Sequence, residues 1–481
     1  MSNNSSAIPK ILPVTCHTDY VGEGSTFVAI KGSQLDGISF IPLALQKGAS
    51  RIVVEQDSEL SPDILAKINS HNSKLIFVKN TRKALSELSA AAWGYPAKKL
   101  NIIGVTGTKG KTTTTFLLNH ILFNSGYKTA MVSGVRNNIA GKNYSASLTT
   151  PLPDYIHAFL YKCVQEKVQF VILESSAQAL SLYRLYGIEF SGIVFTNFDS
   201  EHAEFYSSMS EYFEAKIRIL DQLKASGYAI INADDKWLSG IKLKDNLYTF
   251  SLNKNNVNYV IKVKKNDISG IDLEIQQGQK TYNFGTPNFF GEFNAYNLAG
   301  AVCLLLAFGL ESLKIFRALG KYMYVPGRME KHNLSNGAVA IIDYAHNASS
   351  FSQVLPVLKS ISKNLIVVFG AGGDRDKTKR PIMGNIAASI ADQVILTSDN
   401  PRSEDPQDII NQIQSGISSE YKNKVICEPD RAKAIKLAYS LCQPGDVIAI
   451  LGKGPDEYQM VGNTKFFFSD KQIILNCQKS K

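Results

Sequence analysis

The segment Gly104-Val-Thr-Gly-Thr-Lys-Gly110-Lys111-Thr112-Thr113 contains the pattern that decides the fold of this chain. The apolar residues 102–105 predict a buried strand, and residues 114–125 predict an amphipathic helix. A glycine-rich turn between a strand and a helix brings backbone N–H groups and the helix N-terminus to one point, where both attract phosphate. The strict template of such a loop has glycine where this chain has Val105. The segment therefore predicts a phosphate-binding loop in an α/β domain.

Individual residues of this loop suit the chemistry of a nucleoside triphosphate. Lys111 can reach the β- and γ-phosphates, and the hydroxyl of Thr112 is a ligand that Mg²⁺ accepts. Glycine allows a phosphate to approach the backbone closely because it has no Cβ atom. Lys111 is the leading catalytic candidate, and the candidate ATP-binding residues of the loop are Gly107, Thr108, Gly110, Lys111, Thr112 and Thr113.

The strand-and-helix pattern extends in both directions from the loop. Continuous apolar runs between turn residues are typical of parallel strands buried on both faces, and they predict an α/β fold. Such runs occupy residues 26–30, 51–54, 74–78, 170–173, 193–196, 228–232, 339–342, 365–369, 394–397 and 447–451. Residues 255–288 alternate, as in a small antiparallel insert. We expect a small N-terminal α/β domain (1–98), a central phosphate-loop α/β domain (99–326) and a C-terminal Rossmann-like α/β domain (327–481).

Length and composition restrict the class of protein. At about 150 residues per domain, 481 residues agree with three domains. The net charge of +10 suits either a solvated surface or attraction of anionic ligands. No basic cluster interleaved with aromatic residues suggests nucleic acid. The longest apolar run, residues 298–310, is shorter than the roughly 18 residues of a membrane span. Six scattered cysteines and a polar N-terminus favour a reduced, cytoplasmic location without zinc or disulfides.

The spelling of residues 106–113, Thr-Gly-Thr-Lys-Gly-Lys-Thr-Thr, resembles the ATP loop of the Mur ligase superfamily, the ATP-dependent amide ligases of peptidoglycan precursor synthesis. Further similar motifs are Gly291-Glu-Phe-Asn294-Ala-Tyr-Asn297, Val325-Pro-Gly-Arg328 and Asp343-Tyr-Ala-His346. The resemblance implies contacts to adenine from Asn294 and Asn297, and contacts to the rest of the nucleotide from Arg328, Asp343 and His346. From the residues alone, the first motif also suits a capped helix start.

Three more positions are candidate catalytic and metal-site residues beside Thr112. Glu174 ends a strand next to the loop, where a carboxylate suits Mg²⁺ or a helix N-terminus. His202 follows another strand, and by itself it is an ordinary surface residue. Spacing predicts a solvated helix face for Lys216. The resemblance implies instead a second Mg²⁺ near His202 and Lys216, with Lys216 N-carboxylated.

The remaining motifs concern the substrates that the resemblance implies. Thr149, Thr150, Ser176 and Arg184 match positions that hold a UDP-muramoyl-dipeptide, whereas His17-Thr18-Asp19, Ala177, Gln178 and Leu182 depart from the family pattern. The Gly-rich segment with Arg375, the motif Asp399-Asn400-Pro401-Arg402, Gly452 and Asp456 are similar to the amino-acid pocket of the branch that adds meso-diaminopimelate. The resemblance implies that Arg402 grips the distal carboxylate of that amino acid, a group that lysine lacks.

These matches imply one activity and leave two alternatives. The implied activity joins meso-diaminopimelate to the D-Glu carboxylate of UDP-MurNAc-L-Ala-D-Glu with ATP and Mg²⁺, through an acyl phosphate, in a cytoplasmic monomer. A related ligase could use another acceptor, such as L-lysine or a polyglutamate chain. A protein that binds ATP without turning over a nucleotide sugar would also fit the departures at His17-Thr18-Asp19.

Overall fold

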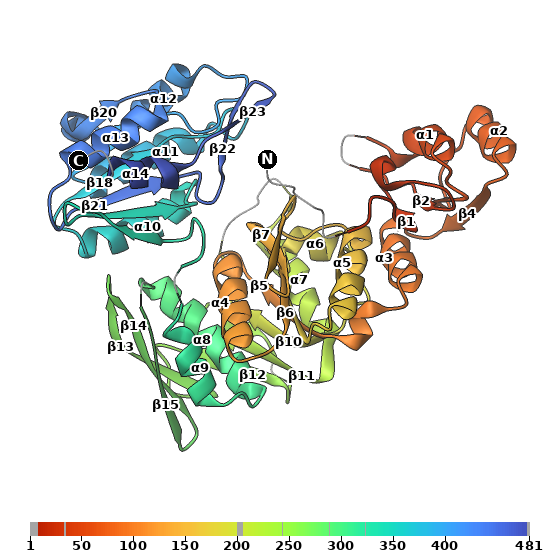
Figure 1. Ribbon diagram of the computed structural model, residues 1–481, viewed down its shortest axis with the longest axis horizontal. Coiled ribbons are helices and arrows are strands. Elements are labelled where there is room, and N and C mark those ends of the chain that lie inside the picture. Colours follow the sequence, from red (N-terminus) through yellow and green to blue (C-terminus); the bar gives the residue numbers. More distant parts are fainter. Residues whose placement is uncertain are drawn as a thin grey trace. The chain divides into compact units, whose positions relative to one another are not determined.

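The computed structural model describes residues 8–32, 35–199, 205–242, 244–287, 289–322 and 324–478, arranged as two compact units (Figure 1). The first unit comprises Met1–Lys264, Leu273–Gly285 and Phe293–Gly320, and the second comprises Lys265–Asp272, Thr286–Glu292 and Lys321–Lys481. Three main sheets organise the chain, and each contains parallel strands, so the predicted α/β class is confirmed. Among the described residues, no helix is both long and apolar enough to cross a membrane.

The first sheet lies near the start of the chain and consists of four parallel strands in the order β1-β2-β3-β4. Its strands are β1 (Val14–Thr15), β2 (Thr26–Val28), β3 (Arg51–Glu55) and β4 (Lys74–Val78). Apolar side chains of α1 (Ile41–Gln46) and α2 (Pro62–Ser70) share a core with one face, and those of α3 (Thr81–Ala92) pack on the other. Of the residues of α2, Ile68 is buried in this core.

The second sheet has eleven strands and carries the phosphate loop. Its parallel centre runs in the order β12-β11-β10-β5-β9-β6, and β5 (Asn101–Thr106) lies between β10 (Phe190–Phe195) and β9 (Phe170–Glu174). The other strands of this centre are β6 (Thr129–Val132), β11 (Leu223–Asn232) and β12 (Leu247–Ser251). The chain crosses to one side of β5 and later to the other. Ligands of open α/β sheets bind at such a switch point, at the carboxyl ends of the strands.

Further strands extend both edges of this sheet. On one side are β7 (Arg136–Ile139) and β8 (Lys142–Ser145), which pair antiparallel. On the other side are β13 (Tyr259–Asp267), β14 (Gly270–Gln277) and β15 (Lys280–Pro287). The predicted insert is therefore a continuation of the central sheet rather than a separate one, because β13 pairs with β12.

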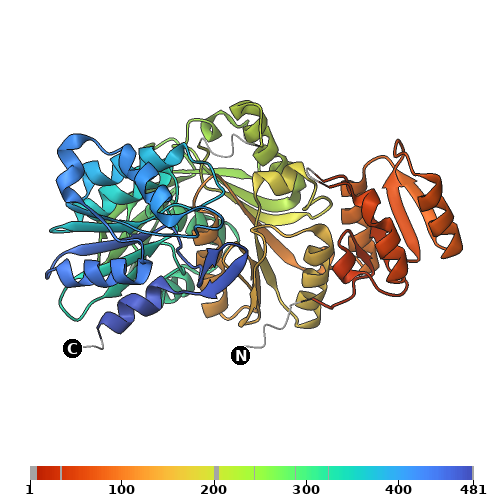
Figure 2. The same ribbon diagram turned by 90° about the horizontal axis from the view of Figure 1, so that it is seen from above.

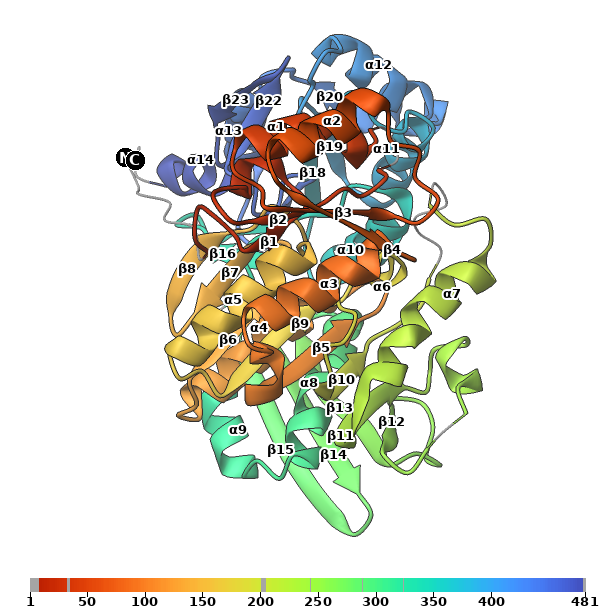
Figure 3. The ribbon, with the colours of Figure 1, turned by 90° about the vertical axis from the view of Figure 1, so that its right-hand side faces the viewer.

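Helices cover the central sheet and place the site residues. Helix α5 (Pro153–Gln165) buries apolar residues against the sheet and lies beside α3 (Figure 3). Helix α4 (Lys111–Asn124) begins at the lysine of the loop, and most of its residues are buried. The prediction of an amphipathic helix over residues 114–125 was wrong in that respect. Four consecutive threonines, Thr112 to Thr115, are buried, and the hydroxyls of Thr112 and Thr114 bond to Glu174 and Asn297 on other elements. Such tertiary contacts bury polar residues that a local pattern places on the surface.

The third sheet belongs to the second unit and has six strands in the order β16-β17-β21-β18-β19-β20, all parallel except β16. These strands are β16 (Glu330–Asn333), β17 (Val339–Asp343), β18 (Leu365–Phe369), β19 (Gln393–Leu396), β20 (Val425–Cys427) and β21 (Val447–Leu451). Its helices lie on both faces of the sheet (Figure 2). A hairpin of β22 (Tyr458–Val461) and β23 (Thr464–Phe467) follows.

Candidate active site

The phosphate loop connects β5 to α4 through two glycines in conformations that side chains disfavour. Gly107 has φ 142° and Gly110 has φ 80°. A Cβ atom on Gly107 would lie 2.0 Å from Thr196 Oγ1, and one on Gly110 would lie 2.1 Å from Asn297 Oδ1. Side chains at these positions would therefore collide as well as strain the backbone. Lys111 Nζ donates to the carbonyl oxygens of Gly107 and Thr108 at 2.9 and 2.8 Å, so its charge lies within the loop.

Glu174 lies beside the loop, as its place at the end of β9 predicts. Its side chain is 1% exposed, and Thr112 Oγ1 donates to Oε2 at 3.2 Å. Oε1 accepts from the backbone N–H of Gly134 at 3.2 Å. A hydroxyl and a carboxylate in contact beside a phosphate loop are oxygen ligands that Mg²⁺ accepts. The helix that follows begins only at Ala177, with Ser176 as its cap, so Glu174 is not the acid of a helix N-terminus.

Lys216 belongs to α7 (Met209–Ile217) and is 1% exposed. The expectation of a solvated helix face from spacing was wrong. Its Nζ donates to Gly107 O at 2.7 Å and lies 4.7 Å from the ring centroid of Tyr212. Tertiary packing of α7 on the loop buries this lysine, which a helix pattern alone cannot reveal. His202 lies outside the described residues, so its predicted place beside Lys216 stays a prediction.

Two residues after β10 hold the loop and were not among the predicted site residues. Thr196 Oγ1 donates to Lys109 O at 2.6 Å, and Asn197 Oδ1 accepts from Lys109 N at 2.8 Å. Thr108 N also donates to Asn197 O at 3.0 Å. Their position directly after a buried strand, β10, which pairs with β5, could have identified them from the sequence as residues beside the loop. These contacts fix the backbone of the loop.

Asn294 and Asn297 lie in α8 (Glu292–Ala307), close to the loop. Asn297 Oδ1 accepts from Thr114 Oγ1 at 3.4 Å, and its Nδ2 donates to Asn294 Oδ1 at 3.2 Å. The helix already begins at Glu292, so neither asparagine caps it. The structure thus places both predicted adenine contacts in the first unit, beside the phosphate loop.

Three of the four predicted dipeptide-binding residues are brought together. Thr150 Oγ1 donates to the carbonyl oxygen of Glu174 at 2.6 Å and accepts from Ser176 N at 3.1 Å. Arg184 Nη1 donates to Thr150 O at 2.8 Å, and burial lowers the pKa of this guanidinium. The hydroxyl of Thr149 lies 3.0 Å from the position that a Cβ atom of Gly134 would occupy. Thr150 thus lies at the backbone of Glu174, and Thr149 lies beside Gly134, whose N–H bonds to the Glu174 carboxylate.

The second unit contains the other predicted nucleotide contacts. Asp343, at the end of β17, accepts from the N–H groups of Met329 and Ala345 at 2.7 and 2.8 Å. Burial raises the pKa of Asp343, and the charge of Arg328 opposes this effect. The Arg328 guanidinium lies 4.7 Å from the centroid of the Tyr344 ring. His346 is exposed, and its Nδ1 lies 2.7 Å from Tyr344 O.

The motif of residues 399–402 follows β19 and lies next to the Gly-rich segment after β18. Arg402 has φ 52°, and its Nη1 donates to Gly373 O at 2.8 Å. Asn400 Oδ1 accepts from Met460 N at 2.8 Å. A Cβ atom on Gly452, which has φ 107°, would lie 2.6 Å from Asp399 Oδ2. The predicted amino-acid residues therefore converge. Arg375 is exposed but belongs to the same cluster, because a Cβ atom on Gly372 would lie 3.0 Å from Arg402 Nη1 and 3.6 Å from Arg375 Cγ.

Two ion pairs, Arg380–Glu404 and Arg431–Asp470, lie beside these amino-acid residues. Neither pair was among the predicted site residues. Arg380, 0% exposed, donates through both Nη atoms to the Glu404 carboxylate at 2.8 and 3.0 Å and to Gly372 O at 3.0 Å. These hydrogen bonds lower the pKa of Glu404 to about 2. Arg431 and Asp470, both buried, form a similar two-fold pair at 2.8 Å.

Lys453 and Asp456 complete the pocket from the segment after β21. Lys453 Nζ donates to Asn400 Oδ1 at 3.3 Å, and burial lowers the pKa of this ammonium group. Burial also raises the pKa of Asp456, and Lys453 opposes this shift. The pocket thus combines a guanidinium with carboxylates, which suits a zwitterionic ligand with a further carboxylate.

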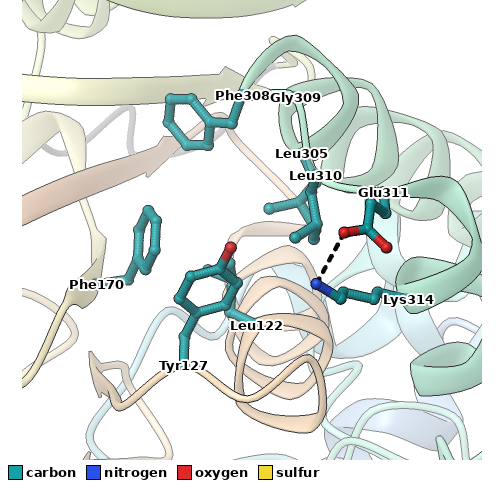
Figure 4. A pocket seen from close by; sticks show the side chains of 9 residues that line it. All are labelled: Leu122, Tyr127, Phe170, Leu305, Phe308, Gly309, Leu310, Glu311 and Lys314. Atoms are coloured by element: carbon teal, nitrogen blue, oxygen red, sulfur yellow. Dashed lines mark hydrogen bonds and ion pairs between the residues drawn. The ribbon is translucent and has the colours of Figure 1, made fainter.

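A separate hollow, lined by aromatic rings and an ion pair, lies at the other end of α4 (Figure 4). The rings of Tyr127, Phe170 and Phe308 border it, and Lys314 pairs with Glu311 at 3.0 Å. Phe170 begins β9, whose opposite end carries Glu174. The hollow is therefore distinct from the phosphate loop.

Comparison with known proteins shows the family to which this chain is similar. The family models "Mur ligase family, catalytic domain", "Mur ligase middle domain" and "Mur ligase, glutamate ligase domain" match residues 11–93, 105–305 and 327–454. The UDP-N-acetylmuramoyl-L-alanyl-D-glutamate–2,6-diaminopimelate ligase of Aquifex aeolicus is 38% identical over 98% of this chain and 94% of its own length. The ligase of the same name from Clostridium perfringens is 35% identical over 96% and 93%.

Solved structures give the same family. A structure of a ligase of that name has a TM-score of 0.68 and 27% identity, covering 98% of this chain and 95% of its own. The MurF ligase of Thermotoga maritima in complex with ADP has a TM-score of 0.61 at 19% identity, covering 100% and 98%, and supports the fold alone. With family models matching most of its length and relatives similar over nearly all of it, this chain belongs to the Mur ligase family.

Proposed function

We propose that this protein is an ATP-dependent amide ligase that adds meso-diaminopimelate to the D-Glu carboxylate of UDP-MurNAc-L-Ala-D-Glu. The observation that carries the proposal is the phosphate loop, where Lys111 lies within the loop and Thr112 contacts Glu174. The relatives named above support the choice of substrates, since they match over nearly the whole chain.

The reaction has two steps, formation of an acyl phosphate and formation of the amide bond. The D-Glu carboxylate attacks the γ-phosphorus of ATP, and the bond to the β-phosphate oxygen breaks, giving an acyl phosphate and ADP. The amine of diaminopimelate then attacks the acyl carbon, loses a proton and expels phosphate. Side chains of the protein position the reactants and neutralise charge rather than form covalent bonds. Lys111 is the main side chain that stabilises the negative charge of the transferred phosphoryl group.

The residues beside the loop fit Mg²⁺. Thr112 and Glu174 supply a hydroxyl and a carboxylate, and Mg²⁺ in phosphoryl-transfer sites takes few protein ligands besides phosphate and water. When bound, the ion would neutralise phosphate charge. Lys216 and His202 are the proposed residues of a second ion. N-carboxylation of Lys216 would replace a buried cation by an anion, which explains why a lysine is buried beside the loop.

The substrate sites are assigned on the same basis. Thr149, Thr150, Ser176 and Arg184 are proposed to hold the dipeptide end of the nucleotide sugar, so that its carboxylate lies near Glu174. Asn294, Asn297, Arg328, Asp343 and His346 are proposed to contact ATP. The amino acid is proposed to bind Arg375, Asp399, Asn400, Pro401, Arg402, Gly452 and Asp456.

The acceptor follows from the chemistry of Arg402. The arginine side chain reaches Gly373 O, and a guanidinium binds a carboxylate in two-fold geometry. Diaminopimelate has this distal carboxylate and L-lysine lacks it. We therefore favour diaminopimelate over lysine as the acceptor.

Release of phosphate from ATP tests the proposal. With Mg²⁺ present, we expect release only when UDP-MurNAc-L-Ala-D-Glu and meso-diaminopimelate are added together. Release that needs lysine instead would contradict the role of Arg402. ATP binding without any release would favour the protein that binds ATP but does not turn over the nucleotide sugar.

A further inference from the structure

Buried hydrogen bonds join the start of the chain to helix α5. Asp154, the second residue of α5, accepts from Thr15 Oγ1 at 2.8 Å and from Cys16 N at 3.4 Å through the same oxygen. The side chain of Asp154 is 3% exposed, and that of Thr15 is fully buried. Burial raises the pKa of Asp154, and the hydrogen bond from Thr15 opposes this shift. A buried carboxylate with these partners fixes both elements, because losing one partner leaves a costly polar group.

The Thr15 hydroxyl extends the link to His17. Its oxygen accepts from the backbone N–H of His17 at 3.0 Å. A hydroxyl has one proton and two lone pairs, so donation to Asp154 leaves a lone pair for His17. The three groups form one chain from α5 to residues 17–19. The resemblance to the Mur ligase superfamily implies a contact between these positions and the uridine of the nucleotide sugar, and in this chain they read His17-Thr18-Asp19, which departs from the family pattern.

The same end of α5 is connected to the dipeptide site. Asp154 lies four residues after Thr150, which bonds to Glu174, Ser176 and Arg184. Residues 150–154 therefore link the proposed dipeptide site with the segment at His17. A nucleotide sugar that occupies both regions at once requires them at a fixed separation. A link that holds this separation before binding lowers the cost of ordering the site, so its loss should weaken binding of this substrate.

Helix geometry alone does not explain Asp154. Helix α2 also begins with proline and aspartate, Pro62-Asp63, but Asp63 is exposed and pairs with Lys67 at 2.7 Å on the same helix. An acid in the first turn interacts favourably with the helix dipole in both cases. Only Asp154 uses its carboxylate to hold another segment, so Asp63 provides a matched control.

We propose that Asp154 is a positioning residue for the nucleotide-sugar substrate, which acts through Thr15 on the segment at His17. The inference rests on the proposed function, because the substrate is the one assigned there. Its contacts lie entirely within the first unit.

Kinetics of Asp154→Ala and Thr15→Val test the role. We expect each to raise the KM for UDP-MurNAc-L-Ala-D-Glu about tenfold while leaving the KM for ATP unchanged. The double variant should be no worse than the stronger single one, because both remove the same link. Asp63→Ala should match the wild type. A fall in kcat with an unchanged KM for the nucleotide sugar would indicate a purely structural role and overturn the proposal.

Hydrogen exchange keeps the inference testable without turnover. In the full chain without ligands, the His17 amide should exchange at least about tenfold faster in Thr15→Val than in the wild type or Asp63→Ala. If Asp154→Ala fails to fold, the Thr15 variant alone supplies both measurements. Unchanged exchange at His17 would overturn the link. Absence of nucleotide-sugar turnover in the wild type would instead refute the proposed function, so the two failures are distinguishable.

Discussion

Lys216 donates from its ammonium group to the carbonyl oxygen of Gly107 at 2.7 Å, although 109 residues separate them in the sequence. Gly107 O also accepts from Lys111. Two lysines from different helices thus meet at one carbonyl of the phosphate loop, within a buried part of the first unit. Two positive charges at one point of the loop are what a polyanionic triphosphate would balance.

The role of Lys216 is tested by its removal. We expect Lys216→Ala to lose ligase activity, and short carboxylates added to the assay to restore part of it, because they replace the carbamate group. Lys314→Ala removes an exposed lysine of the same unit and should retain activity. Full activity of Lys216→Ala without added carboxylates would exclude N-carboxylation as a requirement.

Lys111 should be indispensable for ATP turnover. We expect Lys111→Ala to reduce substrate-dependent phosphate release by roughly 10²-fold or more, since the lysine acts as a preorganised electrostatic group. The melting temperature should change little, because the loop keeps its contacts with Thr196 and Asn197. Release at the wild-type rate would refute the assignment of the loop.

Glu174 should determine the need for Mg²⁺. Glu174→Gln keeps the size of the side chain but removes its charge. We expect the Mg²⁺ concentration at half-maximal activity to rise roughly 10-fold or more, as for other losses at metal sites. Glu166→Gln, which changes an exposed glutamate paired with Lys162, is the control. Equal Mg²⁺ dependence of the two variants would count against Glu174 as a ligand.

Arg402 should determine the affinity for the amino acid. Breaking a charge pair while its partner stays buried costs roughly 2–5 kcal/mol, so Arg402→Ala should raise the KM for meso-diaminopimelate at least about 30-fold. The KM for ATP, measured on the same variant, is the internal control. A rise below about threefold would be too small for a lost carboxylate contact.

A buried histidine predicts how stability depends on pH. Neither ring nitrogen of His157 on α5 has a hydrogen-bond partner among the described residues, and burial lowers its pKa from 6.5 to about 4. Below pH 6.5, His157 is protonated in the unfolded chain but stays neutral in the folded chain. The free energy of unfolding therefore falls as the pH drops from 6.5 towards 4. Because each unit of pKa difference corresponds to about 1.4 kcal/mol, the loss in the free energy of unfolding approaches roughly 3 kcal/mol near pH 4.

His157→Leu removes this titration. We expect its stability relative to the wild type, measured by urea unfolding, to stay nearly constant from pH 7.5 to 6.5 and to increase as the pH falls from 6.5 to 4.5. A difference that is constant over this range would mean that His157 does not titrate differently in the two states.

The fold was predictable because its strands are uniformly apolar and end in recognisable turns. The strands of the third sheet over residues 365–369 and 447–451 have the predicted bounds. The glycine-rich sequence predicted the phosphate loop, and Gly107 adopts φ 142°, a conformation that only glycine suits. The edges of the sheets were harder to predict. Strand β13 extends the central sheet by pairing with β12, and no local sequence pattern indicates which strands pair.

The site was predictable where residues follow strands, and unpredictable where distant segments meet. Glu174, Asp343 and Asp399 each lie at or just after the end of a strand, so their positions were within reach of sequence reasoning. The burial of Lys216 and the contact of Thr15 with Asp154, 139 residues apart, depend on tertiary packing. Arg380 appeared in the sequence as part of a charged run, although it is fully buried against Glu404.

The most direct test of the account is the mass of the product. The protein is incubated with ATP, Mg²⁺, UDP-MurNAc-L-Ala-D-Glu and equal amounts of meso-diaminopimelate and L-lysine, and the nucleotide products are analysed by mass spectrometry. The account predicts one product, the nucleotide dipeptide joined to diaminopimelate with loss of water. A lysine adduct as the main product, or no adduct while ATP is bound, would contradict it.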